Sequence, residues 1–179
     1  MDSQPDQGPD ARPLLLLTND DGVHAEGLRL LARAIDHLGE VVIVAPASEQ
    51  STRSHALTLH RPLRVLPVGP GVWSVDGTPA DCTYVALHHP TMLPRKPALV
   101  LSGINHGANL GSDVFYSGTV AAAREAAFRG VPSMALSMPS DASPAACAER
   151  AVAFVERLLG ALTQTPPGAT PLLNLNFPH

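Results

Sequence analysis

Two adjacent carboxylates follow the first apolar run of the sequence, in the stretch LLLLTNDDG that spans Leu14 to Gly22. Asp20 and Asp21 repel each other when both are ionised, so the pair needs either full solvation or a group that offsets the repulsion. A bound divalent cation would do this, and carboxylates joined by hydroxyl and amide oxygens favour Mg²⁺, Mn²⁺ or Ca²⁺ over zinc. A solvated turn or a helix N-terminus is the alternative, and the dipeptide alone leaves both open.

Two further polar clusters follow apolar runs and could join the acidic pair. The first extends from Ser48 to Thr52, after the run VVIVAP, and the second begins at Ser102 and continues through the glycine-rich stretch SGINHGANLGSDVFYSGT. This stretch leads into a predicted helix at Thr119, where backbone N–H groups can bind an anion and Ser117 adds a hydroxyl donor. A phosphate beside a metal would be bound well there. An ordinary long loop that ends in a Ser or Thr cap is the alternative.

The elements that must position these clusters alternate along the chain. Apolar runs predict strands at residues 14–18, 40–46, 97–103, 131–138 and 171–177, and periodic patterns predict helices at 28–38, 78–89, 119–130 and 143–160. Thr78, Pro79 and Asp81 are typical of a helix start. The alternation predicts an α/β fold, Rossmann-like and doubly wound around a mostly parallel sheet. Ligands bind at the carboxyl ends of the strands in such sheets, and all three polar clusters fall at such ends.

The composition restricts the class of protein. The chain has 179 residues, of which 45% are hydrophobic and 16% charged, as in one globular domain. Its net charge of −4 offers no basic surface for a nucleic-acid duplex, and no apolar run is long enough to span a membrane. Cys82 and Cys147 form neither a CxxC pair nor a disulfide framework, so we expect a cytoplasmic protein. Residues 1–13 are acidic and proline-bearing, and we expect them to be a disordered leader.

Several other sites are not supported by the residues. The sequence contains no P-loop, no GxGxxG after the first strand and no GxSxG. A receiver-type signalling domain would need an aspartate and a lysine that the third and fifth parallel strands lack. We interpret His24, His55 and His106 as incidental to a metal site, although His106 is the best candidate for a catalytic or substrate contact. Trp73 and Tyr84 are interpreted as core or surface residues rather than as a platform for a base.

Six motifs resemble, in order, those of the SurE family of stationary-phase survival 5′/3′-nucleotidases: TNDDG, VVIVAP followed by EQS, HALTLHRPLRV, VDGTPADC, VLSGINHGANLG and YSGTVAAAREAAFRGVPSMALS. The resemblance implies metal-dependent hydrolysis of nucleoside 5′- and 3′-monophosphates. It implies one Mg²⁺ or Mn²⁺ per subunit, with Ca²⁺ as a substitute in a crystal. The implied metal ligands are Asp20, Asp21, Ser51 and Asn105, with Asp20 and Asp21 also catalytic, and the implied phosphate pocket is Asn109, Ser117, Gly118 and Thr119.

The resemblance also sets expectations for the assembly. We expect a nucleotidase domain at residues 14–179 that lacks the C-terminal swapped arm of the family, which would begin where this chain reads NLNFPH. The intact protein is expected to be a homodimer or homotetramer. Ser51 is followed by Thr52 and Arg53, a departure from the small residues of the family, and Arg53 could contact phosphate. Exopolyphosphatase or broad phosphatase activity, and a catalytically incomplete module that binds metal and nucleotide, are the alternatives.

Overall fold

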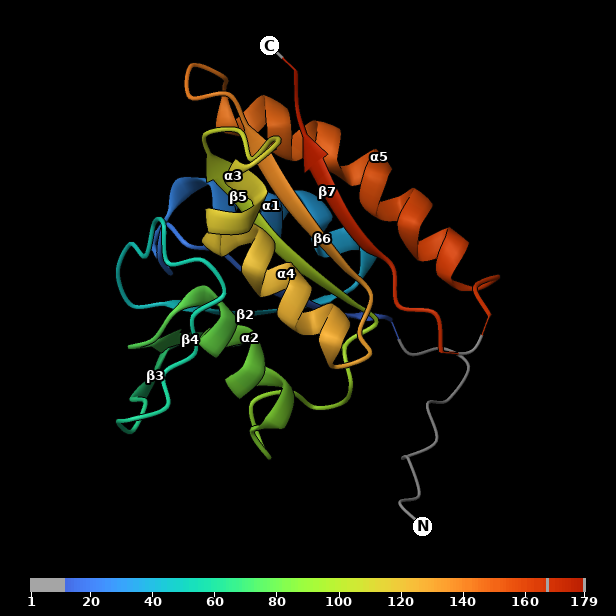
Figure 1. The fold of residues 1–179 in the computed structure, drawn as a ribbon. Coiled ribbons are helices and arrows are strands. Elements are labelled where there is room, and N and C mark those ends of the chain that lie inside the picture. Colours follow the sequence, from blue (N-terminus) through green and yellow to red (C-terminus); the bar gives the residue numbers. More distant parts are fainter. Residues whose placement is uncertain (1–11, 167, 179) are drawn as a thin grey trace.

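The fold is described from a computed structural model, for residues 12–166 and 168–178. The strands are β1 (Leu14–Thr18), β2 (Glu40–Pro46), β3 (Val65–Gly69), β4 (Val72–Val75), β5 (Leu99–His106), β6 (Ser133–Met138) and β7 (Leu172–Asn176). The α-helices are α1 (Glu26–Ile35), α2 (Pro79–His88), α3 (Asp113–Tyr116), α4 (Gly118–Phe128) and α5 (Pro144–Leu162), and a 3₁₀ turn, η1 (Asp36–Leu38), follows α1. The strands form one sheet in the order β3-β4-β2-β1-β5-β6-β7 (Figure 1).

The sheet is parallel except at one edge. Strands β3 and β4 pair antiparallel, and every other neighbouring pair is parallel. Helices α1 and α5 cover one face, and α2 and α4 cover the other (Figure 1). The predicted α/β fold, Rossmann-like and doubly wound around a mostly parallel sheet, is therefore confirmed.

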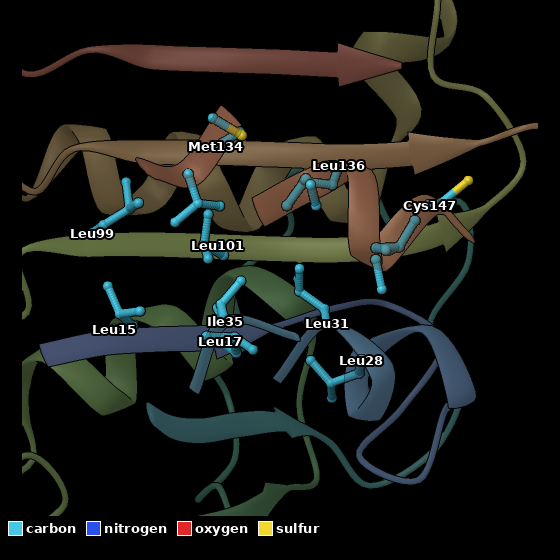
Figure 2. Close-up of a cluster of buried hydrophobic side chains, with 14 of the residues drawn as sticks. Leu15, Leu17, Leu28, Leu31, Ile35, Leu99, Leu101, Met134, Leu136 and Cys147 are labelled. Carbon is cyan, nitrogen blue, oxygen red and sulfur yellow. The ribbon is translucent and has the colours of Figure 1, made fainter. Parts of the chain in front are cut away.

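Burial on both faces explains why the first strand is a continuous apolar run. Leu15 and Leu17 point into the core beneath α1 and α5, which Figure 2 shows, whereas Leu14 and Leu16 pack beneath α2. All four leucines are at most 1% exposed. A strand that alternates between two apolar cores needs no polar side chain until it leaves the sheet. The first polar group that it delivers to the rim is the segment from Asn19 to Asp21.

The order of the strands identifies where a ligand would bind. From β1 the chain moves to β2 on one side, and it later returns to place β5 on the other side of β1. The direction of winding therefore changes between β1 and β5, and Thr18 lies beside Ser102 in register there. Doubly wound sheets open a crevice at the carboxyl ends of the strands at such a point. The acidic pair and the end of β5 meet at this point of the sheet.

Several boundaries differ from the prediction, and those near the polar clusters bear on the site. Strand β5 continues past Gly103 to His106, so Asn105 lies on the strand and not in the loop. Its hydrogen-bond ladder with β6 resumes after a register shift. This shift could not be predicted from the sequence, because a glycine inside the motif indicates the end of a strand. The loop that follows contains the short helix α3, and α4 begins at Gly118, one residue before the predicted start.

Hydrogen bonds fix both the end of the expected leader and the start of α2. Most of the expected leader lies outside the described residues, but Arg12 and Pro13 belong to the domain: Glu40 N donates to Pro13 O at 2.8 Å, and the Arg12 guanidinium donates to Gly39 O at 2.7 Å. Thr78 caps α2 as predicted, in a reciprocal capping box with Asp81.

Candidate active site

Asp20 is a buried carboxylate held by a helix that lies far away in the sequence. It follows β1 directly, and only 5% of its surface is exposed. Its Oδ1 accepts a hydrogen bond of 2.5 Å from the hydroxyl of Thr119, in the first turn of α4. Burial raises the pKa of Asp20, whereas the hydroxyl and the backbone amide of Thr119 lower it by stabilising the ionised form. The structure therefore fixes Asp20 at the N-terminus of α4.

The first turn of α4 approaches Asp20 too closely for a side chain. A Cβ at Gly118 would lie 2.9 Å from the Cβ of Asp20 and 3.0 Å from its Oδ2, so glycine is required. Ser117 caps the helix, because its Oγ accepts a hydrogen bond of 3.1 Å from Val120 N. The positive end of the helix dipole thus faces Asp20 and any anion bound beside it.

Asp21 has the most strongly perturbed environment of the acidic pair. Burial, and next the charge of Asp20, raise the pKa of Asp21 from its ordinary value of 3.8 to about 6. The backbone of His106, at the end of β5, forms a hydrogen bond to Asp21 that lowers this pKa in part. The charge of Glu49 raises the pKa of both aspartates. Three carboxyl groups therefore repel one another here, which is the condition that a bound cation relieves.

The turn that presents the pair is braced by its own side chain. Asn19 is fully buried, and its Nδ2 donates to Gly22 O at 3.0 Å while its Oδ1 accepts from Gly22 N at 3.2 Å. Gly22 has a φ of +103°, a conformation that other residues rarely adopt. Val23 N then donates to Pro46 O at 2.8 Å, so the turn is fastened to the end of β2. The orientation of the acidic pair is set before any ligand binds.

The loop after β2 brings Ser51 to the edge of the site. Gln50 N donates to Asp20 O at 2.7 Å, which fastens the loop to the acidic turn. Ser51 is exposed, and its hydroxyl donates to Glu49 Oε1 at 2.7 Å. A surface hollow of about 430 Å³ is lined by residues 49–53, Arg53 included. Ser51 therefore bonds Glu49, and the charge of Glu49 acts on both aspartates. We assigned Glu49 no role from the sequence, although it lies two positions away in the same cluster.

The two asparagines near β5 are placed differently. Asn105 lies beside His106, whose backbone bonds Asp21, and the Nδ2 of Asn105 donates to Gly107 O at 2.6 Å. Asn109 is buried and bonds away from the acidic pair, because its Nδ2 donates to Ser137 Oγ at 2.8 Å.

The backbone of Asn109 is also engaged with the last strand. Its N–H donates to Asn176 Oδ1 at 2.8 Å, and its carbonyl accepts from Asn174 and Asn176 at 2.9 and 3.2 Å. The side-chain amide of Asn109 has a second N–H besides the one that bonds Ser137. Sequence reasoning missed this bracing, because residues 174 and 176 lie in a strand that reads as a core element.

Of the histidines and large aromatic residues considered from the sequence, only His106 contacts the acidic pair, through its backbone. His24 is exposed, and His55 bonds Glu125 on α4. His106 contacts the site through its backbone, and its side chain is exposed. Trp73 packs against the core beneath α2, whereas Tyr84 is 40% exposed on that helix.

Two other kinds of feature are absent from residues 12–166 and 168–178. These residues contain no group of three or more His, Cys, Asp or Glu side chains arranged to hold a metal ion. The predicted ligand set contains only two carboxylates, so it does not belong to that class. None of the helices in the same residues is both long and apolar enough to cross a membrane.

Comparison with known proteins identifies relatives over nearly the whole described chain. The family model for the survival protein SurE matches residues 15–179. The protein named 5′-nucleotidase SurE from Sorangium cellulosum (strain So ce56) is 56% identical over 168 residues, which are 93% of this chain and 65% of that protein. Its namesake from Myxococcus xanthus (strain DK1622) is 47% identical over 168 residues, 92% of this chain and 62% of that protein.

A solved structure shares the fold. The crystal structure of the SurE protein from Aquifex aeolicus superposes with a TM-score of 0.81 at 39% identity, and the match covers 92% of this chain and 66% of that one. The chain thus spans a little less than two thirds of the length of each of these relatives.

Proposed function

The chain belongs to the SurE family, and from this premise we propose that it is a metal-dependent phosphomonoesterase that hydrolyses nucleoside 5′- and 3′-monophosphates. The observation that carries the proposal is the meeting of Asp20, Asp21 and the first turn of α4 at the switch point of the sheet. An acidic pair that can hold a cation lies there beside a helix N-terminus that can hold a phosphate.

The residues present suit a hard divalent cation. The donors are the carboxylates of Asp20 and Asp21, the amide oxygen of Asn105 and the hydroxyl of Ser51, all of them oxygen ligands. Burial, and next the charges of neighbouring carboxylates, raise the pKa values of the two aspartates, and a bound cation would offset both. We propose one Mg²⁺ or Mn²⁺ per subunit. When bound, the cation supplies Lewis acidity at the phosphoryl group and lowers the pKa of water.

The side chains of the chain would divide the remaining work. Thr119 holds Oδ1 of Asp20, so an oxygen of the acidic pair that does not bind the cation would orient water or take its proton. An oxygen of Asp21 that the cation leaves free would serve the same purpose, since the cation holds this carboxylate in its ionised form. The start of α4 (Ser117, Gly118 and Thr119), together with the second amide N–H of Asn109, would bind the phosphate oxygens and stabilise charge that develops there.

Release of inorganic phosphate tests the proposal. We expect the protein to release phosphate from AMP and from 3′-AMP with Mn²⁺, and to stop when a chelator is added in excess. A panel that includes polyphosphate and p-nitrophenyl phosphate decides between a nucleotidase and a broad phosphatase. Binding of Mn²⁺ and AMP without turnover would instead identify a catalytically incomplete module, and the proposal would be wrong.

The assembly and the location are also proposals. We propose a homodimer or homotetramer, which light scattering on the full-length gene product would test through its molar mass. The relatives are named as nucleotidases, and a cytoplasmic location, where nucleoside monophosphates are abundant, stays a prediction. Fractionation of cells followed by immunodetection would test it.

A further inference from the structure

We propose that His55 and Glu125 are positioning residues, which hold the loop that carries Ser51 and Glu49 in register with the acidic pair. The inference rests on the proposed function, because it assigns these two side chains to the same metal site. His55 Nε2 and Glu125 Oε2 are 2.8 Å apart, and they join the loop after β2 to helix α4.

The loop needs such a support because its backbone is unfavourable on its own. Residues 47–64 contain no helix or strand, and Ser51, Thr52 and Arg53 are exposed. Thr52 and Ser54 have φ angles of 59° and 50°, in the left-handed region that residues with a side chain avoid. Such conformations persist where the surrounding contacts impose them.

Contacts from Gln50 to His55 impose this conformation on the strained residues. Gln50 N donates to Asp20 O at 2.7 Å before them, and Ser54 N donates to Tyr116 O at 3.0 Å within them. The bridge from His55 to Glu125 follows immediately and is the first side-chain attachment after Ser51. Ser51 is therefore held between a bond to the acidic turn at Gln50 and the two bonds, to α3 and α4, at Ser54 and His55.

Glu125 is a rigid partner. Its side chain is 2% exposed, and its second oxygen, Oε1, accepts a hydrogen bond of 2.7 Å from Arg129 Nε. The His55 ring also stacks on Phe128, with 5.6 Å between the ring centroids and 10° between the planes. A carboxylate fixed at both oxygens and a ring fixed by stacking allow little freedom.

Helix α4 links the two halves of the proposed site. Its first turn bonds Asp20 through Thr119, and its later residues bond and stack against His55. The helix therefore sets the distance between the acidic pair and the Ser51 loop. Loss of the bridge is expected to loosen Ser51 and Glu49 while Asp20 and Asp21 keep their places.

The test compares Mn²⁺ affinity in variants of this bridge and of a matched pair elsewhere. His37 and Glu156 form another His–Glu pair, 3.8 Å apart and 60% and 53% exposed, between η1 and α5 on the opposite face of the sheet. The variants are His55→Ala, His55→Gln, Glu125→Gln and the double variant His55→Ala/Glu125→Gln, with His37→Ala as control. Calorimetry measures the affinity for Mn²⁺. Steady-state kinetics at saturating Mn²⁺ give KM and kcat for AMP, and thermal unfolding in chelator gives Tm.

We expect His55→Ala and Glu125→Gln each to weaken Mn²⁺ binding roughly 3- to 10-fold, below the 10- to 100-fold typical of a direct outer-shell partner, because His55 acts through the loop. The double variant should be no weaker than the weaker single variant, since both remove one bridge. His55→Gln should recover part of the affinity, and His37→Ala should change it less than twofold. KM for AMP should stay within twofold of wild type.

Unchanged Mn²⁺ affinity in both His55→Ala and Glu125→Gln would overturn the inference, as would equal losses in the His37 control. If His55→Ala does not fold, His55→Gln and Glu125→Gln decide the question in the same way, because both keep a polar side chain at the bridge. Failure of the proposed function is seen separately: wild type would then bind Mn²⁺ and release no phosphate, while the affinity ratios still test the bridge.

Discussion

Replacing Asp21 with asparagine should stabilise the metal-free protein while it removes activity. Asn has nearly the same shape as Asp but carries no charge, so the change removes both the cost of burying a charge and the repulsion from Asp20 and Glu49, which together raise the pKa of Asp21. The folded protein holds the Asp21 proton more tightly than the unfolded chain does. The contribution of Asp21 to stability is therefore fully present below pH 3.8 and is lost as the pH rises through about 6.

The size of this effect follows from the pKa change. A rise from 3.8 to about 6 corresponds to roughly 3 kcal/mol if the charge were fully shielded from water. Asp21 is only partly buried, so solvent screens the ionised form, and we expect about 1–2 kcal/mol above pH 6. For a chain of this length, that difference raises Tm by roughly 2–8 °C.

Urea denaturation in excess chelator at pH 5 and pH 8 measures the difference. We expect Asp21→Asn to be more stable than wild type by a larger margin at pH 8 than at pH 5, and to release no phosphate with Mn²⁺. Equal margins at the two pH values, or a variant less stable than wild type at pH 8, would refute the account of a strained acidic pair.

Four further perturbations follow from the same contacts. Asp20→Asn should abolish phosphate release with an unchanged far-UV circular dichroism spectrum; retained turnover would remove Asp20 from the site. Thr119→Val leaves a buried carboxylate oxygen without its donor, so urea denaturation at pH 8 should show a loss of about 1–3 kcal/mol. Gly118→Ala forces a Cβ onto Asp20, and a loss of about 1–3 kcal/mol together with weaker Mn²⁺ binding is expected; an unchanged protein would contradict the close approach. Mn²⁺ at 100 times its Kd should add about 2.7 kcal/mol to the wild type and nothing to Asp20→Asn, which thermal scans would check.

Most of the fold could be predicted from local pattern. The buried strands are continuous apolar runs in the sequence, because both faces of a parallel sheet are covered. The start of α2 was predicted from Thr78, Pro79 and Asp81, which are typical capping residues. The extension of β5 to His106 could not be predicted, because a register shift inside a glycine-containing motif depends on pairing with β6. Pairing of that kind is a tertiary property.

The candidate site was predictable in its residue types but not in its contacts. The rule that polar groups gather at the carboxyl ends of strands placed Asp20, Asp21 and Asn105 at one edge. The bond from Thr119 to Asp20 joins two distant segments, and only the packing of α4 on the sheet reveals it. The same holds for His55, which we interpreted as incidental to a metal site and which the structure places against Glu125 on that helix.

Anomalous diffraction from crystals soaked in Mn²⁺ tests the central claim most directly. The account predicts one anomalous peak per chain, in contact with carboxylate oxygens of both Asp20 and Asp21 and within reach of Asn105. A peak elsewhere on the chain, or a saturating soak that leaves the acidic pair without density, would contradict it.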